Sequence, residues 1–325
     1  MRVWRAIFLL SSGLLTPQTI FAQGIPRDTS FTVYSAAVKV QKQYPFAKII
    51  VPELPAGVVV HEDIVYLSLG PRELHLDVFQ PEKPEDGPYP GVLLVHGGGW
   101  RSGSKSQMVP LAQKLAARRY VTAAVEYRLS IEAGYPAAVF DLKAAVRWMR
   151  ANAQKYRIDS SKITILGCSA GAHLATLVGC TNGVRKFDDD TGWLEFSSDI
   201  QAIVNIDGLV DFTNPEALKY ENIPEKPSVA ILWLGGSFAE RPERWREASP
   251  IYYVNADTPP IIFVNSILDR FHAGRDEMLE KFGKHNIYYE VHTIPDTPHP
   301  FWLFHPWFEP TFDLVLNFLN KTFNR

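Results

Sequence analysis

Short apolar runs alternate along this chain with stretches in which apolar residues recur every three or four positions. The apolar runs are typical of buried strands and lie at residues 91–95, 121–125, 163–166, 203–206, 261–264 and 287–294. The stretches with helical spacing lie between or after them, near residues 108–115, 137–156, 276–285 and 311–323. This alternation predicts an α/β fold, with a mostly parallel sheet covered by helices on both faces.

Two further strands are predicted before the first of these runs, at residues 58–69 and 73–79, and we expect them to be antiparallel. Residues 182–200 and 213–250 are long connections at the carboxyl edge of the sheet, where ligands bind in such folds. They are long enough to form a small cap over that edge.

The first residues have the pattern of an export signal. Arg2 and Arg5 precede an apolar stretch at residues 6–15, and Ala22 is a small residue suited to cleavage. A core helix or a membrane anchor is the alternative, but the run is short for a bilayer span. We therefore expect a signal peptide at 1–22, an extended lead-in at 23–57 and a catalytic domain at 58–325. No cysteine lies near the cleavage point, so we expect a secreted or periplasmic protein without a bacterial lipid anchor.

Composition narrows the classes of function. Of the 325 residues 46% are hydrophobic, which is ample for a core, and the net charge of −2 gives no electrostatic case for nucleic acid. The two cysteines, Cys168 and Cys180, fit neither a disulfide framework nor a zinc site. No second candidate membrane span follows the first apolar stretch.

The strongest chemical signal is Gly-Cys-Ser-Ala-Gly at residues 167–171, between a predicted strand and a predicted helix. Glycines on both sides of Ser169 allow a sharp turn and close packing of the helix. The turn lifts the serine hydroxyl out of the sheet and places the next amide at a helix N-terminus. This arrangement is the nucleophile elbow, so Ser169 is the candidate nucleophile, with a tight structural turn as the alternative.

A second signal is His-Gly-Gly-Gly-Trp at residues 96–100, directly after a buried strand. Three glycines leave N–H groups free to bind the negative charge that develops during acyl transfer. A phosphate loop would need a lysine and a hydroxyl residue at set positions, and these are missing. The segment therefore predicts an oxyanion hole, and His96 is expected to support the loop.

A serine nucleophile needs a histidine base that is oriented by a carboxylate. His299 lies in a proline-rich loop after the last strand, where the base is expected, and His305 is the reserve. Asp269 follows the strand at 261–264 and fits the chain order serine, acid, histidine. Asp207, just after the strand at 203–206, is the main alternative, followed by Asp211 and Asp296.

These segments resemble those of a known family, together with Tyr-Arg-Leu at 127–129, Pro-Ala-Ala at 136–138, Asp141 and Ala-Ser-Pro at 248–250. The chain resembles the α/β-hydrolase esterases of the hormone-sensitive-lipase-like group, and among them bacterial acetyl esterases that act on xylan and pectin. The resemblance implies a triad of Ser169, Asp269 and His299, with the amides of Gly98, Gly99 and Ala170 as oxyanion donors. The sequence departs from the family at Asn265-Ser266, where His-Gly is usual, and at Pro298, where Gly is common.

The resemblance implies an acetyl esterase that acts on plant cell-wall polysaccharide or its oligosaccharides and needs no metal or cofactor. Another serine hydrolase, such as a lipase or an exopeptidase, is the alternative, and an inactive binding module is a third. Trp100 and Trp302 are candidate substrate contacts. The second belongs to an aromatic cluster at 301–308, which could either stack on a sugar or pack the last helix. The sequence leaves the oligomeric state open.

Overall fold

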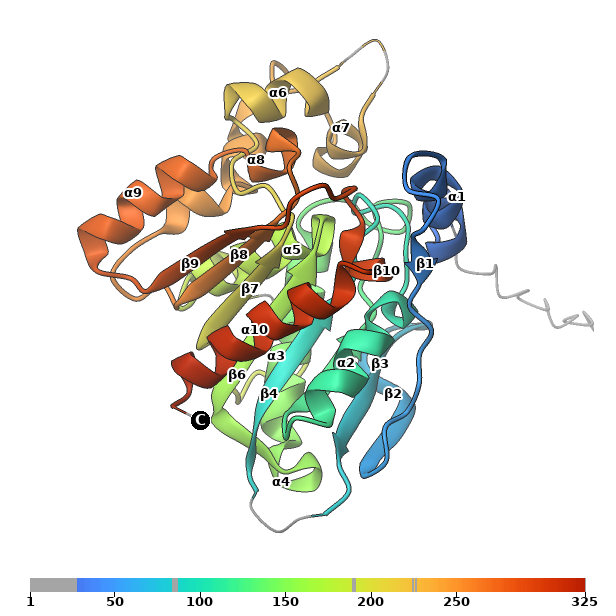
Figure 1. The fold of residues 1–325 in the computed structure, drawn as a ribbon. Coiled ribbons are helices and arrows are strands. Elements are labelled where there is room, and N and C mark those ends of the chain that lie inside the picture. The colour runs from blue at the N-terminus through green and yellow to red at the C-terminus, as the bar shows by residue number, and fades with distance from the viewer. Residues whose placement is uncertain (1–27, 84–86, 189–190, 224, 226, 325) are drawn as a thin grey trace, which may run out of the picture.

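Eight strands form one sheet in the order β2-β3-β5-β4-β6-β7-β8-β9 (Figure 1). The computed structural model describes residues 28–83, 87–188, 191–223, 225 and 227–324. The six strands from β5 to β9 in that order are parallel, and β2 and β3 pair antiparallel at one edge. Their bounds are β2 Val58–Leu69, β3 Arg72–Pro81, β4 Tyr89–Val95, β5 Val121–Val125, β6 Ile158–Cys168, β7 Ala202–Ile206, β8 Ile261–Asn265 and β9 Tyr289–Thr293. The predicted sheet is confirmed.

Helices cover both faces of the sheet, as predicted. The core on one face includes α3 (Ala137–Ala151), α5 (Ala170–Cys180) and α9 (Arg275–His285). The core on the other face includes α2 (Val109–Ala116) and α10 (Phe308–Thr322). Successive side chains of β4 enter opposite cores, because a strand directs its side chains alternately to its two faces.

The helix predicted over residues 137–156 is interrupted. It forms α3 and a short α4 (Ala153–Tyr156), separated by Asn152, whose backbone leaves the helical region. The Asn152 side-chain amide donates to the carbonyl oxygen of Trp148 at 3.0 Å, which is the local competition with helix hydrogen bonds expected of Asn.

The N-terminal segment is more structured than the expected extended lead-in. Residues 33–43 form α1 (Val33–Gln43), which begins with a capping box between Thr32 and Ser35. Apolar residues of α1 are buried in the same core as α2 and α10. The strand β1 (Lys48–Ile49) pairs antiparallel with β10 (Phe304–His305). The predicted signal peptide at 1–22 lies outside the described residues.

A cap lies beyond the carboxyl ends of the strands, but only one of the two expected connections builds it. Its helices are α6 (Pro215–Glu221), α7 (Val229–Leu234) and α8 (Pro242–Glu247), and Figure 1 shows α8 beside α9. Residues 182–188 and 191–200 pack instead along α3 and β2: Arg147 donates to the carbonyl oxygen of Gly192, and the Trp193 indole donates to that of Tyr66.

Five short 3-10 helices complete the described structure: η1 (Lys105–Met108), η2 (Arg185–Phe187), η3 (Pro250–Tyr253), η4 (Asp269–His272) and η5 (Phe301–Leu303). Among the helices described, none has both the length and the apolar character needed to cross a bilayer.

Candidate active site

Ser169 lies in the turn between β6 and α5, with φ 55° and ψ −123°. A positive φ is costly for a residue with a side chain and persists where the surroundings enforce it. The two flanking glycines explain how the turn is packed. A Cβ on Gly167 would lie 2.0 Å from the carbonyl oxygen of Gly171, and one on Gly171 would lie 2.3 Å from that of Val95. Only glycine fits at both positions, so the local geometry is the nucleophile elbow.

His299 reaches Ser169 from the loop after β9. Its Nε2 lies 2.7 Å from the Ser169 Oγ, a short hydrogen bond between the two side chains. Two aromatic rings hold the imidazole: Phe271 stacks on its face at 3.4 Å between centroids, and Trp302 meets its edge at 5.2 Å. His305, the reserve base, is half exposed and contacts Glu309 instead.

The carboxylate beside His299 is that of Asp207, which corrects the expected Asp269. His299 Nδ1 lies 2.7 Å from Asp207 Oδ2. Asp269 begins η4 with its side chain in an exposed position. The sheet order explains the difference, because β7 is the neighbour of the elbow strand β6 and β8 is one strand farther away. The Ser169 amide also donates to the carbonyl oxygen of Ile206 at 2.8 Å, which brings the next residue, Asp207, close to the elbow.

Asp207 is fully buried and its other oxygen is also bound. Oδ1 accepts the Ser266 amide at 2.8 Å and lies 3.3 Å from His272 Nε2. Burial alone raises the pKa of this carboxyl, but hydrogen bonds from His272 and His299 outweigh burial and hold the pKa below its usual range. The carboxylate is therefore ionised at neutral pH. Ser266 belongs to the Asn265-Ser266 departure noted in the sequence, and its amide helps to hold the acid.

The imidazole of His299 is held in its neutral form. Burial lowers its pKa, Asp207 acts in the opposite direction, and the positive charge of Arg270 lowers the pKa further; the net pKa lies below the ordinary 6.5. A neutral imidazole can accept the serine proton, so the group is ready as a base at neutral pH.

The glycine loop after β4 lies beside Ser169. Gly98 has φ +127°, and a Cβ there would meet the Ser102 carbonyl oxygen at 2.1 Å. Gly98, Gly99 and Ala170 all line the cavity that contains Ser169 and His299, as the predicted oxyanion donors must. His96 stacks on Tyr127 with centroids 4.4 Å apart, and burial lowers its pKa to about 4, so it supports the loop as a neutral ring.

The cavity has a volume of about 420 Å³, within the range of small-molecule sites. Trp100 lines it, but its indole is 5% exposed, stacks on Trp233 of α7 and donates to His173 Nδ1 at 3.1 Å. Trp302 packs against His299 and is not part of the cavity wall. The aromatic residues at 301–308 are buried around α10, which favours core packing over a sugar-stacking surface. No cluster suited to a metal ion occurs among the described residues.

Three charged side chains of the cavity wall were missed by sequence reasoning: Lys39 on α1, Glu221 at the end of α6, and Arg270 in η4. Phe271, which stacks on the base, was missed as well. Nothing local in the sequence marks them, since they come from the lead-in, the cap and the segment first assigned to the acid.

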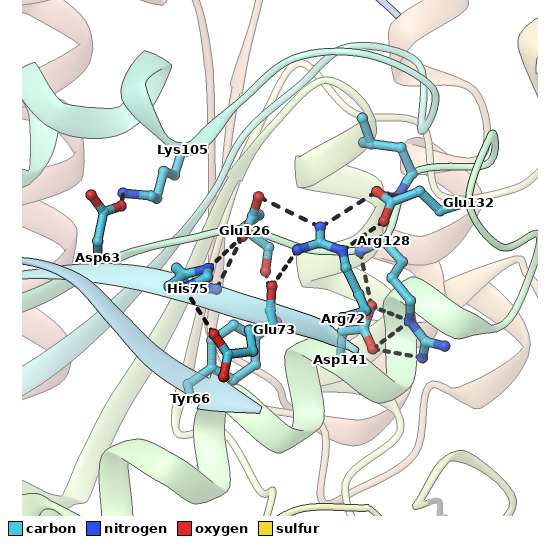
Figure 2. A network of polar contacts seen from close by, with 11 residues as sticks. Asp63, Tyr66, Arg72, Glu73, His75, Lys105, Glu126, Arg128, Glu132 and Asp141 are labelled. Carbon is cyan, nitrogen blue, oxygen red and sulfur yellow. Dashed lines mark hydrogen bonds and ion pairs between the residues drawn. The ribbon is translucent and has the colours of Figure 1, made fainter. Parts of the chain in front are cut away.

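A second cavity, of about 950 Å³, lies behind the glycine loop and contains a network of paired charges (Figure 2). Arg72 contacts Glu132 at 2.7 Å and Glu126 at 3.5 Å, and Glu126 also accepts from His75. Lys105 bridges Asp63 and Asp77. The network ties β2 and β3 to the loops after β4 and β5, and so braces the back of the glycine loop.

Comparison with known proteins identifies the family. A model of the BD-FAE family matches residues 76–273, which is more than half of the chain. The chain belongs to the BD-FAE family. The chain is 31% identical to Esterase LipC of Mycobacterium tuberculosis over 216 residues, which is 65% of this chain and 51% of LipC. It is 28% identical to the probable carboxylic ester hydrolase LipM of the same organism, over 74% of this chain and 56% of LipM. The chain thus spans about half the length of these curated relatives.

Solved structures agree on the α/β-hydrolase fold. A bifunctional GH43-CE protein of Bacteroides eggerthii is 26% identical with a TM-score of 0.69, covering 81% of this chain and 38% of that one. The apo form of Thermogutta terrifontis esterase 2 is 26% identical with a TM-score of 0.66, covering 83% and 96%. A truncated carbohydrate esterase from gut microbiota, at 23% identity and a TM-score of 0.71, shows the fold alone.

Proposed function

We propose that this protein is a serine esterase that hydrolyses short-chain esters, in particular acetyl esters on carbohydrate, through an acyl-enzyme. The observation that carries the proposal is the hydrogen-bonded chain from Ser169 through His299 to Asp207, with 2.7 Å at each step. Nucleophile, base and orienting acid are then in contact, as acyl transfer requires.

In this mechanism His299 Nε2 takes the Ser169 proton while Oγ attacks the ester carbonyl carbon. The tetrahedral oxyanion is stabilised by the amides of Gly98, Gly99 and Ala170, which donate hydrogen bonds. Asp207 keeps Nδ1 protonated and stabilises the imidazolium. His299 then gives its proton to the leaving alcohol oxygen, the C–O bond breaks, and the acyl group stays on Ser169. A water molecule, deprotonated by His299, completes the second half in the same way and releases the acid.

Several findings support the substrate class. The GH43-CE and Thermogutta esterase structures share this fold at 25% identity or more, and two of the latter are described as propionate-bound and butyrate-bound. The cavity of about 420 Å³ suits a small ester. The export pattern at 1–22 supports an encounter with polysaccharide or oligosaccharide outside the cytoplasm. We propose a secreted or periplasmic location, with plant cell-wall xylan or pectin as candidate substrates.

The test is a series of p-nitrophenyl esters from acetate to octanoate, together with acetate release from acetylated xylan, pectin and free acetylated sugars. We expect kcat/KM to be highest at acetate and to fall by butyrate, with acetate released from at least one glycan. A maximum at octanoate would contradict the carbohydrate assignment and favour a lipase. A flat profile without acetate release would leave a general carboxylesterase, and no labelling of Ser169 by a fluorophosphonate would contradict the serine mechanism itself.

A further inference from the structure

Two cationic side chains line the catalytic cavity without forming an ion pair. They are Lys39 of α1 and Arg270 of η4, and neither forms an ion pair with any residue in the described part of the chain. The nearby acid in the wall is Glu221, whose pKa burial raises, with Arg270 acting against that shift. Glu221 thus interacts electrostatically with Arg270, but neither cation is held in an ion pair by a described residue.

Arg270 is held in place by aromatic rings. Its guanidinium lies over Phe271 at 4.3 Å and over Tyr220 of α6 at 5.6 Å. The imidazole of His299 occupies one face of Phe271 at 3.4 Å, so the guanidinium must occupy the other face. The imidazole of His299, the ring of Phe271, the guanidinium of Arg270 and the ring of Tyr220 therefore follow one another in a stack. These ring contacts restrain the guanidinium, whose planar fork of N–H donors can bind a carboxylate with two hydrogen bonds.

The position of Arg270 indicates which half of the ester it faces. His299 must protonate the leaving oxygen, so the alcohol half of the substrate lies beside His299. Arg270 is separated from that imidazole by only one ring. A group on the alcohol half can therefore reach Arg270.

Lys39 approaches the same cavity from another segment. It lies on α1, and Ser30 and Phe31, which precede that helix, also form part of the cavity wall. Lys42 lies one turn farther along the same helix, is exposed, and is not part of that wall. The same helix therefore carries one lysine in the cavity wall, Lys39, and a matched lysine outside it, Lys42.

We propose that the alcohol half of the substrate carries a carboxylate, as in an acetylated uronic acid unit, and that Arg270 and Lys39 bind it. The inference rests on the proposed esterase function and names its substrate class. A neutral sugar would offer these cations no opposite charge, whereas a carboxylate gains charge-assisted hydrogen bonds from each.

The test uses the full chain and a matched pair of aryl acetates, 4-acetoxybenzoate and its neutral amide, 4-acetoxybenzamide. Each kcat/KM is divided by the rate constant for hydrolysis of the same ester by hydroxide, which corrects for intrinsic reactivity. The corrected value for 4-acetoxybenzoate is then divided by that for 4-acetoxybenzamide, and this ratio is compared among variants. We expect wild type to favour the anion about tenfold, Arg270→Met to lose about fivefold of this preference and Lys39→Met about twofold, as ion pairs near a surface do. Lys42→Met is the control and should keep the wild-type ratio. Arg270→Lys should keep more of it than Arg270→Met.

Three results would overturn the inference. The first is a ratio in Arg270→Met and Lys39→Met equal to that in Lys42→Met. The second concerns monophenyl succinate, whose charge is on the acyl half. The inference fails if the preference for monophenyl succinate over phenyl acetate exceeds the preference for 4-acetoxybenzoate over 4-acetoxybenzamide. The third is faster acetate release from neutral acetylated oligosaccharides than from those containing uronic acid. In each of these cases, cleavage of the acetyl ester of 4-acetoxybenzamide by wild type leaves the esterase proposal intact. If wild type cleaves neither aryl acetate, the esterase proposal itself is refuted.

Discussion

Two charged regions adjoin the glycine loop, and they handle charge in opposite ways. In the second cavity, Arg72 contacts Glu126 and Glu132 (Figure 2), and Lys105 contacts Asp63 and Asp77. In the catalytic cavity, Arg270 and Lys39 line the wall and form no ion pair among the described residues. The network connects strands and loops that must stay fixed, whereas the cavity keeps its cations available for a ligand. Paired charge thus indicates bracing and unpaired charge indicates recognition.

The contrast between the two charged regions first requires that ester hydrolysis takes place at Ser169 in the catalytic cavity. Ser169→Ala should lower kcat by at least about 10⁴-fold, because nucleophile and base act as a unit. The fold should persist, since alanine fits a turn that already holds a serine. Single-turnover kinetics and circular dichroism would check both statements. More than a tenth of wild-type activity remaining would place the chemistry elsewhere.

The acid provides the next largest effect. Asp207→Asn should lower kcat by about 10³–10⁴-fold, because an amide cannot keep the imidazole in the correct tautomer or stabilise the imidazolium. Asp269→Asn removes the same charge from an exposed position and should stay within about twofold. A damaged Asp269→Asn beside an active Asp207→Asn would reverse the assignment.

The network should respond in stability and not in selectivity. Arg72→Met leaves Glu126 and Glu132 without their cation and should lower the free energy of unfolding by about 1–3 kcal/mol. Urea denaturation measures this change, with the exposed Lys42→Met as the control. The preference for 4-acetoxybenzoate over its amide should be unchanged in Arg72→Met. A loss of that preference without a loss of stability would erase the distinction between the two regions.

The smallest effect concerns pH. The activity should rise as pH increases through the pKa of His299, which lies below 6.5, because only the neutral imidazole accepts the serine proton. The positive charge of Arg270 lowers this pKa, so Arg270→Met should move the midpoint of kcat/KM upward at low salt. The measurement uses the neutral substrate 4-acetoxybenzamide. A midpoint in Arg270→Met that is lower than, or equal to, the midpoint in Lys42→Met would contradict the electrostatic effect of Arg270 on His299.

Sequence reasoning predicted the features that depend on local pattern. The sheet, the elbow at Ser169 and the position of His299 follow from apolar runs, glycines and chain order. The acid could not be fixed in this way, since Asp207 and Asp269 both follow a strand and only the order of β6, β7 and β8 separates them. The roles of α1 and Arg270 depend on which distant segments meet at the cavity, and one sequence does not specify that.

The central claim is that His299 is bonded to Asp207, and proton NMR of the imidazole tests it most directly. A strongly deshielded His299 Nδ1 proton is expected in wild type and in Asp269→Asn, because a short bond to an ionised carboxylate withdraws density from that proton. The signal should vanish or move far upfield in Asp207→Asn. Its survival in Asp207→Asn together with its loss in Asp269→Asn would contradict the account.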